Sequence, residues 1–300
     1  MNYIKFLEGQ EDILSPGLSS CPGCASELAT RTALKIIGKN TIMTIPPGCM
    51  AGAGCVGFGF KHGSCIPAQI SLLDNPASLA AGIKAMYERK GRDDVHVVVI
   101  AGDGASADCG FQSLSGAAER GDNIIYICYD NEGYMNTGFQ RSSTTPLGAS
   151  TTTTPSGSSG RGKEQSKKNL SMIMAMHNCA YTATLSPAYM PDFVNKIQKA
   201  MTIKKGMSYL HIFAPCPTGW KTRPDMSIEL ARKAVQTNFF PLFEVEDGKY
   251  KITKEVKNPL PVREYIKLIG RMKHLNEEEI SNIQKTVDKQ YNLLKLLAQA

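Results

Sequence analysis

The feature that most constrains this fold is the alternation of short, continuously apolar runs with longer segments of helical periodicity. The apolar runs predict strands at Thr41–Ile45, Val95–Ile100, Ile124–Cys128 and Tyr209–Phe213. The periodic segments predict helices at Ala25–Gly38, Pro76–Lys90, Gly110–Arg120, Leu170–Asn178 and Met190–Lys204. Strands that are apolar on both faces lie in sheets that helices cover on both sides. The sequence therefore predicts an α/β fold with a mainly parallel sheet flanked by helices.

The composition of the 300 residues excludes several classes of protein. Hydrophobic residues make up 42% and charged residues 20%, which excludes a disordered chain. No apolar run approaches the roughly 20 residues of a membrane-spanning helix, so we expect no membrane partner. The net charge of +7 comes without a basic block or a zinc-finger spacing, so we expect no nucleic-acid partner. Glu8, Glu11 and Asp12 stand where a signal peptide is basic and then apolar, which predicts a cytoplasmic protein.

The pattern changes near Ser227, and we therefore predict two parts, a domain over residues 1–225 and a C-terminal extension over 226–300. The extension is predicted to hold a helix at Ser227–Thr237, a hairpin at Pro241–Thr253, and helices at Val262–Lys273 and Glu277–Leu297. Asn276 is the predicted cap of the last helix. We expect the extension to pack on the domain or on partner subunits and to carry no chemistry of its own.

A long loop is predicted at Ser142–Gly160, where seventeen of nineteen residues are Ser, Thr, Gly or Pro. Such a segment buries little apolar surface. Loops of this kind serve as lids or partner contacts about as often as they are merely flexible.

An aspartate between two glycines follows the second predicted strand, and an Asp-Asn pair follows the third. These residues are Gly102, Asp103, Gly104 and, twenty-eight residues after Asp103, Asn131. Open parallel sheets bind ligands at the carboxyl ends of such strands. The glycines let a phosphate approach the backbone, and the oxygens of Asp103 and Asn131 suit Mg²⁺. The alternative is a pair of ordinary turns at strand ends.

Four of the nine cysteines form the pattern C-x₂-C-x₂₄-C-x₁₆₆-C, namely Cys21, Cys24, Cys49 and Cys216. Cys49 and Cys216 follow predicted strands and therefore belong to the same sheet edge as Asp103. Four thiolates there can hold a [4Fe–4S] cluster or Zn²⁺, and buried thiols without a metal are the remaining alternative. Cys109, Cys128 and Cys179 are predicted to be small core residues. Cys55 and Cys65 are also predicted to be core residues, with a redox pair or alternative metal ligands as the other possibilities.

The Asp103 and Asn131 pairing resembles the diphosphate-binding motif of thiamine diphosphate enzymes. The resemblance implies that Asp103 and Asn131 are Mg²⁺ ligands, with a main-chain carbonyl near Gly133 as a third. In that family a glutamate from a separate domain activates the aminopyrimidine ring of the cofactor. Because this chain is too short to hold both the diphosphate-binding domain and the domain that supplies the glutamate, the resemblance implies an obligate partner subunit.

Five motifs over about residues 15–275 resemble the β subunit of the multi-subunit 2-oxoacid:ferredoxin oxidoreductases, the pyruvate synthase group. They are Cys21–Cys24, Pro47-Gly48-Cys49, GDGASAD at Gly102–Asp108, YDNEGYMNTGFQRSS at Tyr129–Ser143 and APCPTGW at Ala214–Trp220. The resemblance implies a thiamine diphosphate-binding fold and one [4Fe–4S] cluster on Cys21, Cys24, Cys49 and Cys216. It also implies that Gly48 and Thr137 contact the cofactor and that Asn136 faces the reacting carbon as a catalytic residue.

The same resemblance implies partners and a substrate class. An α-type subunit would bind the aminopyrimidine, a ferredoxin-like subunit would hold further clusters, and ferredoxin would accept the electrons. This chain lacks the C-x₂-C-x₂-C-x₃-C-P run of the ferredoxin-like subunit. A small 2-oxoacid is the implied substrate: pyruvate with coenzyme A is the first candidate. Oxalate, which needs no coenzyme A, is the second, because the segment after Cys49 departs from the pyruvate enzymes.

Two other functions remain open from the sequence. A zinc-stabilised α/β binding subunit would use the four cysteines without electron transfer. A non-redox thiamine-dependent lyase would use Asp103 and Asn131 and leave the cysteines incidental.

Overall fold

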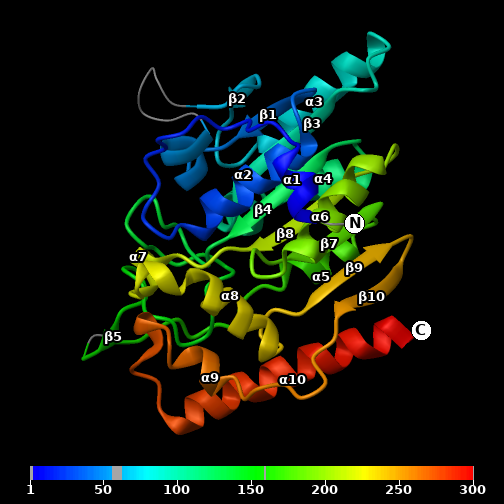
Figure 1. Ribbon diagram of the computed structural model, residues 1–300. Coiled ribbons are helices and arrows are strands. Elements are labelled where there is room, and N and C mark those ends of the chain that lie inside the picture. The colour runs from blue at the N-terminus through cyan, green and yellow to red at the C-terminus, as the bar shows by residue number, and fades with distance from the viewer. Residues whose placement is uncertain (1–2, 56–62, 159, 300) are drawn as a thin grey trace.

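The computed structural model describes residues 3–55, 63–158 and 160–299, and within them eight strands form one sheet. The strand order is β10-β9-β7-β8-β4-β3-β1-β2 (Figure 1). The parallel strands are β1 (Thr41–Ile45), β2 (Ala68–Ile70), β3 (His96–Gly102), β4 (Ile125–Asp130), β7 (Tyr181–Leu185) and β8 (Ser208–Phe213). A hairpin of β9 (Leu242–Glu246) and β10 (Lys249–Lys254) extends the sheet: β9 runs antiparallel to β7, and β10 runs antiparallel to β9. The prediction of a mainly parallel α/β sheet is therefore confirmed.

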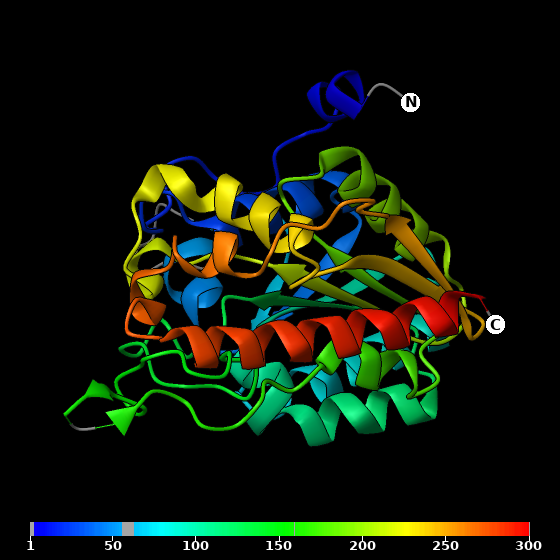
Figure 2. The ribbon, with the colours of Figure 1, turned by 90° about the horizontal axis from the view of Figure 1, so that it is seen from below.

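Helices cover both faces of the sheet, as Figure 2 shows from below. One face carries α2 (Ala25–Ile37) and α6 (Met190–Thr202), and the other carries α3 (Pro76–Arg89), α4 (Phe111–Arg120) and α5 (Leu170–Ala175). Side chains of β3 alternate between the two cores: Val98 and Ile100 pack with the first layer, and Val97 and Val99 with the second. This alternation explains why the strand is apolar at every position.

The remaining elements are short or peripheral. They are α1 (Tyr3–Glu8), α7 (Pro217–Trp220), α8 (Ser227–Gln236), α9 (Arg263–Ile266), α10 (Glu277–Gln299), the small pair β5 (Ser156–Gly157) and β6 (Gly160–Arg161), π-helical turns at Met50–Cys55 and Gly104–Cys109, and 3₁₀ turns at Pro224–Met226 and Gly270–Met272. None of the helices in the described ranges is both long and apolar enough to cross a membrane.

Three local predictions differ from the structure. The strands β2 and β7 were not expected, because β2 has three residues and β7 intersperses threonines among its apolar residues. The helix expected at Leu170–Asn178 ends at Ala175. The helix expected at Val262–Lys273 is divided into α9 and a 3₁₀ turn beginning at Gly270. A Cβ at Gly270 would lie 2.3 Å from the carbonyl oxygen of Lys221, so this point of the chain packs directly against another backbone.

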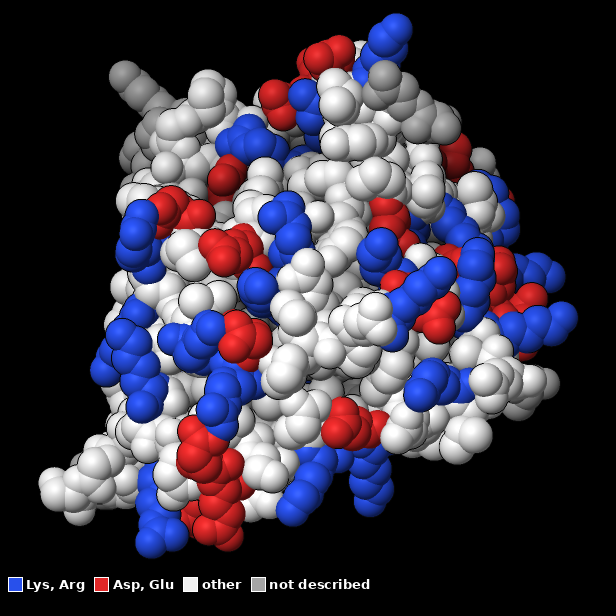
Figure 3. Space-filling view, turned by 60° about the horizontal axis from the view of Figure 1, so that its bottom comes forward, with Lys and Arg blue, Asp and Glu red and all other residues white. Residues whose placement is uncertain are grey.

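The C-terminal extension packs on the same sheet. Its hairpin turns at Asp247 and Gly248, both with positive φ, and β9 pairs with the edge strand of the parallel array. A separate core joins α8, α9 and α10 to Phe213 and Trp220. The face that carries α10 mixes Lys and Arg with Asp and Glu (Figure 3). The boundary between residues 225 and 226 stays a prediction, because the two parts share one sheet.

The segment between β4 and α5 is a long loop, as predicted, although it is not simply a surface loop. Ser142, Thr144 and Thr145 are fully buried and point toward the ends of β3 and β4. The polar composition therefore supplies buried hydrogen-bond donors, a role that the sequence pattern did not reveal.

The predicted cap of α10 is confirmed by two reciprocal hydrogen bonds. The Glu279 amide donates to Asn276 Oδ1 over 2.9 Å, and the Asn276 amide donates to Glu279 Oε2 over 2.8 Å. This arrangement satisfies two backbone donors that the first turn of a helix otherwise leaves open.

We expect Asn276→Ala to lower the free energy of unfolding by about 1 kcal/mol, because it removes one cap acceptor. Thermal and urea denaturation of the full chain would measure the change. Asn282→Ala is the matched control, since Asn282 lies exposed within the same helix. Equal effects of the two substitutions would contradict the role of the cap.

Candidate functional site

A pocket opens where β1, β3 and β4 end, and all eight predicted cofactor-binding residues line it. These are Gly48, Gly102, Asp103, Gly104, Asn131, Gly133, Asn136 and Thr137. Asn136 and Thr137 are exposed at its rim, whereas Asp103 and Asn131 are buried at its base. The topology brings these residues together because parallel strands present their carboxyl ends at one edge. Their roles toward a cofactor remain predictions.

Two glycines of the pocket have no room for a side chain. A Cβ at Gly104 would lie 2.4 Å from the ring of Tyr134, and a Cβ at Gly133 would lie 2.9 Å from the Gln140 carbonyl oxygen. The backbone at both positions therefore forms the pocket wall itself. A phosphate can approach such a wall closely, as the glycine pattern predicts.

The Asp103 carboxylate is completely buried at the base of the pocket. Ser142 Oγ donates to Asp103 Oδ2 over 2.5 Å, and Thr144 Oγ1 lies 2.9 Å from the same oxygen. Burial and the neighbouring charge of Asp130 raise the pKa of Asp103 well above its usual value. A cation at Asp103 Oδ1 would relieve both effects, because it compensates the buried charge.

The donors around Asp103 fit a small divalent cation. One end of the Asn131 side-chain amide lies 3.0 Å from Asp103 Oδ1 and 2.9 Å from the Gly133 carbonyl oxygen. With its nitrogen at this end, the amide donates a hydrogen bond to each of the two oxygens. With its oxygen at this end, three oxygens face one another at the spacing of about 3 Å that neighbouring ligands of octahedral Mg²⁺ have. The Gly133 carbonyl thus lies beside Asp103 and Asn131, and its role as a metal ligand stays a prediction.

The four patterned cysteines lie near one another beside this pocket. Cys24 is the N-cap of α2, and Cys216 is the N-cap of α7. Their Sγ atoms accept hydrogen bonds from the backbone amides of Glu27 and Gly219, each over 3.4 Å. Burial is the main cause that raises the pKa of the Cys49 thiol to about 12 and that of Cys216 to about 11, and the neighbouring thiols of the set contribute to both increases. Cys21 is exposed. Thiols with raised pKa values lose their protons readily only to a bound metal.

These thiols do not converge on one point. In the parts of the chain that are described, no three His, Cys, Asp or Glu side chains form a site for a single metal ion. Cys49 is close enough to Cys21, Cys24 and Cys216 for their charges to act on it, and Cys49 also lines the pocket.

The predictions for the remaining cysteines are partly wrong. Cys128 and Cys179 are buried, as expected. Cys65 and Cys109 are exposed, which corrects the expectation of core positions. Cys109 ends the π-helical turn after β3, where its Sγ lies 3.3 Å from Tyr134 Oη at the pocket rim. The side chain of Cys55 lies outside the described residues.

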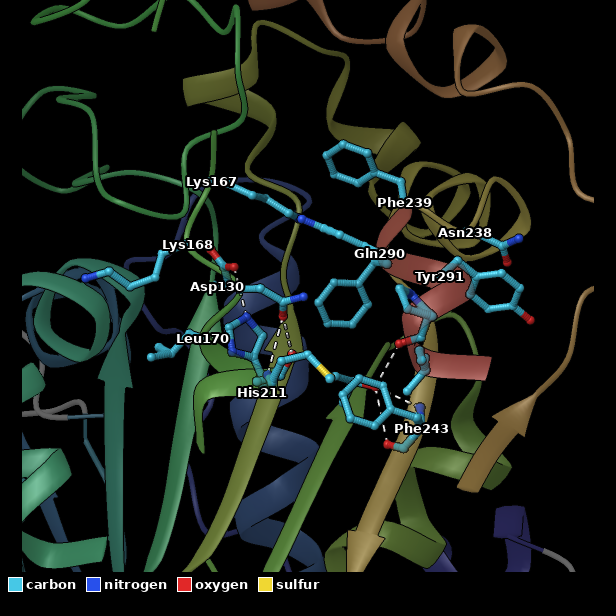
Figure 4. Close-up of a pocket in the computed structure, with 17 residues that line it drawn as sticks. Asp130, Lys167, Lys168, Leu170, His211, Asn238, Phe239, Phe243, Gln290 and Tyr291 are labelled. Carbon is cyan, nitrogen blue, oxygen red and sulfur yellow. Dashed lines mark hydrogen bonds and ion pairs between the residues drawn. The ribbon is translucent and has the colours of Figure 1, made fainter. Parts of the chain in front are cut away.

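A buried polar network lies behind the pocket, and the sequence patterns did not predict it. Asp130 Oδ1 lies 2.8 Å from Thr144 Oγ1, and Asp130 Oδ2 lies 2.9 Å from His211 Nε2, whose other ring nitrogen meets Tyr209 Oη. Burial opposes the charge of Asp130, but the contact with His211 holds the pKa of Asp130 below its usual value. Asp130 and His211 also form the wall of a second pocket, where Lys167 and Phe239 lie opposite them (Figure 4).

The turn that carries Asn131 and Gly133 is held from the C-terminal extension. Arg271 Nη2 lies 2.5 Å from Glu132 Oε2, and Arg271 Nη1 donates to the Glu132 carbonyl over 3.0 Å. Both side chains are buried, and Glu132 has a φ of 60°. The guanidinium lies over the ring of Trp220, whose Nε1 donates to the Asn131 carbonyl over 2.9 Å. These partners are far apart in sequence, so no local pattern could identify them.

Comparisons with known proteins agree with this site. Residues 36–212 match the model for the thiamine pyrophosphate enzyme, C-terminal TPP binding domain. The chain is 50% identical to the β subunit of NADH-dependent phenylglyoxylate dehydrogenase from Aromatoleum evansii, covering 92% of this chain and 62% of that relative. It is 45% identical to pyruvate synthase subunit PorB from Methanothermobacter thermautotrophicus, covering 93% and 96%. It is 44% identical to ketoisovalerate oxidoreductase subunit VorB from Pyrococcus furiosus, covering 96% and 94%.

Among solved structures, the fold is similar to a chain of 2-oxoglutarate:ferredoxin oxidoreductase from Magnetococcus marinus. The TM-score is 0.57 at 21% identity, and the match covers 73% of this chain and 79% of that chain.

We expect Arg271→Met to lower the free energy of unfolding by about 3 kcal/mol, because it leaves the buried Glu132 with only the more distant Lys167, 3.9 Å away, as an ion-pair partner among the described residues. Adding Glu132→Gln should restore much of the loss, since the poorly compensated charge is then gone. Arg263→Met is the control: Arg263 pairs with Glu277 on the surface, where such pairs contribute about 0–1 kcal/mol. Urea denaturation of the unmodified chain and these three variants would measure the differences, and similar losses at Arg271 and Arg263 would refute the argument.

Proposed function

Because the chain belongs to the thiamine pyrophosphate enzymes, as a β subunit of the 2-oxoacid:ferredoxin oxidoreductase family, we propose that it catalyses the oxidative decarboxylation of a small 2-oxoacid. Pyruvate is the first candidate substrate, and oxalate is the second. One observation carries the proposal: the oxygen donors of Asp103, Asn131 and Gly133 share a pocket with Cys49, one of four neighbouring thiols.

Thiamine diphosphate would supply the electron sink that allows a 2-oxoacid to lose CO₂. In this chain Asp103, Asn131 and the Gly133 carbonyl would hold the Mg²⁺ that carries the diphosphate. Gly48, Gly102 and Gly104 leave room for it along the wall. Asn136 and Thr137, at the rim, would contact the cofactor, and Asn136 is the candidate to face the substrate.

The proposed overall reaction balances with coenzyme A as acyl acceptor. A 2-oxoacid anion and coenzyme A give the acyl thioester, CO₂, one proton and two electrons, and two one-electron acceptors take the electrons. For oxalate the dianion gives two CO₂ and two electrons, so coenzyme A is not needed.

Cys21, Cys24, Cys49 and Cys216 would hold a [4Fe–4S] cluster, which supplies a one-electron carrier toward ferredoxin. In such a cluster each thiolate binds its own iron. The mutual interaction of Cys49 with Cys21, Cys24 and Cys216 supports a shared metal centre, for which structural zinc is the alternative. The relatives, which are named as dehydrogenase or oxidoreductase subunits, disfavour a lyase with incidental cysteines.

The pocket supports the need for a partner subunit. Asp103 is the sole carboxylate among the described residues that line it, and Asp103 is engaged at the metal position. The acid that acts on the aminopyrimidine would therefore come from an α-type subunit. A ferredoxin-like subunit would receive the electrons beside the exposed Cys21.

The experiment that tests the proposal is anaerobic reduction of ferredoxin or a viologen dye by the purified native complex. Pyruvate, oxalate, 2-oxoisovalerate, 2-oxoglutarate and phenylglyoxylate are compared, each with and without coenzyme A. We expect reduction with pyruvate only when coenzyme A is present. Reduction with oxalate in the absence of coenzyme A would support the same reaction class with oxalate as the substrate. No reduction with any acid would overturn the proposal.

Cys216→Ser should lower ferredoxin reduction more than about 100-fold, since even changes around metal ligands cost about 10–100-fold. Iron and acid-labile sulfide content should fall with it. Cys65→Ser is the control, because Cys65 is exposed and lies outside the set of four. Unchanged turnover in the Cys216 variant would favour the non-redox lyase, and zinc without sulfide in the native protein would favour the binding subunit.

A further inference from the structure

The side-chain amide of Asn131 lies between the metal position and the thiols. One end of the amide lies 3.0 Å from Asp103 Oδ1 and 2.9 Å from the Gly133 carbonyl oxygen. Its other end lies 3.9 Å from Cys49 Sγ. The residue is buried, and the bond from Trp220 to its carbonyl fixes its backbone. Rotation of the amide about its own bond is therefore the main freedom that remains.

The two ends of this amide have opposite chemistry, so its two orientations suit different states of the metal position. An amide oxygen ligates cations, whereas an amide nitrogen only donates hydrogen bonds. With a cation present, the oxygen must face Asp103 and Gly133, and the nitrogen then faces Cys49. Without a cation, turning the amide by half a revolution gives two hydrogen bonds, to Asp103 Oδ1 at 3.0 Å and to the Gly133 carbonyl at 2.9 Å.

The turned orientation would bring the amide oxygen toward Cys49 Sγ. An oxygen lone pair repels a thiolate, whereas an N–H group stabilises it. The charge environment of Cys49 therefore depends on whether the metal position is filled. The charge of Asp103 also acts on Cys49 through space, but Asn131 is the residue whose side chain contacts both the metal position and the thiol.

We propose that Asn131 couples cation binding in the pocket to the reduction potential of a cluster held on Cys49. The inference rests on the proposed function. Hydrogen bonds to cluster sulfurs tune the potential, and they favour the reduced form because it carries more negative charge. Binding of Mg²⁺ raises the potential, and by linkage reduction of the cluster tightens Mg²⁺ binding by the same factor. The electron acceptor is thus most effective when the cofactor site is loaded.

The test measures this linkage in the intact complex, with thiamine diphosphate present and Mg²⁺ added or removed by chelation. The signal of this cluster in electron paramagnetic resonance is identified as the one that Cys216→Ser abolishes. Its midpoint potential is then measured in each state. We expect the potential to rise by about 59 mV with Mg²⁺, equal to tenfold tighter Mg²⁺ binding by the reduced protein for a one-electron couple. Calorimetric titration of Mg²⁺ into the oxidised and the dithionite-reduced complex gives the reciprocal value.

Asn131→Asp separates the amide from the direct charge of the cation. The variant keeps an oxygen for Mg²⁺ but has no N–H for Cys49, so the shift should fall by more than half. Cys109→Asp is the control: it adds the same charge at the rim of the pocket, beside Tyr134 and outside the set of four thiols, so the shift should persist.

A full shift in Asn131→Asp would overturn the proposal, because direct charge would then explain it. No shift in the unmodified complex would overturn it as well, and this measurement does not depend on any variant. A preparation without iron and acid-labile sulfide would instead refute the proposed function, so the two failures are distinguishable.

Discussion

Two buried carboxylates that share one hydroxyl determine the chemistry of this site. Asp103 and Asp130 end or follow adjacent strands, and Thr144 Oγ1 lies within 2.9 Å of both. Asp130 is compensated by His211, which holds the pKa of Asp130 below its usual value against burial. On the side away from the pocket, Asp103 Oδ2 meets the hydroxyl groups of Ser142 and Thr144, and burial and Asp130 together raise the pKa of Asp103. The imbalance leaves one carboxylate whose free oxygen faces the pocket, which is the arrangement that a divalent cation completes.

Long-range contacts then fix the other donors around Asp103. The turn from Asn131 to Gly133 has no regular structure of its own, and Glu132 adopts a left-handed conformation that a non-glycine residue rarely takes. Arg271 and Trp220 hold this turn through one carbonyl each. Arg271 belongs to the extension, which therefore acts as part of the site's support. That the extension carries no chemistry of its own stays a prediction, whereas Arg271 shows that the extension helps to position the turn that lines the pocket.

The sequence was sufficient to locate the site because the site follows from topology. Once the strands are predicted to be parallel, Cys49, Asp103, Asn131 and Cys216 must emerge at one edge, whatever the rest of the chain does. The partners of those residues depend instead on packing between segments 139 residues apart in the case of Glu132 and Arg271, and no periodicity encodes that contact. The same limit explains the other errors. Gly270 begins a 3₁₀ turn after α9, where its backbone packs directly against Lys221, and Cys109 is exposed at the end of the π-helical turn after β3.

The metal position and the thiols are mechanically one unit rather than two neighbouring sites. Cys216 caps α7 and Trp220 ends it, so a single turn of helix positions a thiol and holds the Asn131 carbonyl. Asn131 in turn presents its amide to both Asp103 and Cys49. A displacement of Cys216 at one end of α7 is therefore expected to displace Trp220 and Asn131 at the other end, and the reverse, because closely packed groups rearrange together rather than independently. Such rigidity is useful where electrons leave a bound intermediate. The distance and the hydrogen bonds between donor and acceptor are then set by the fold before any ligand arrives.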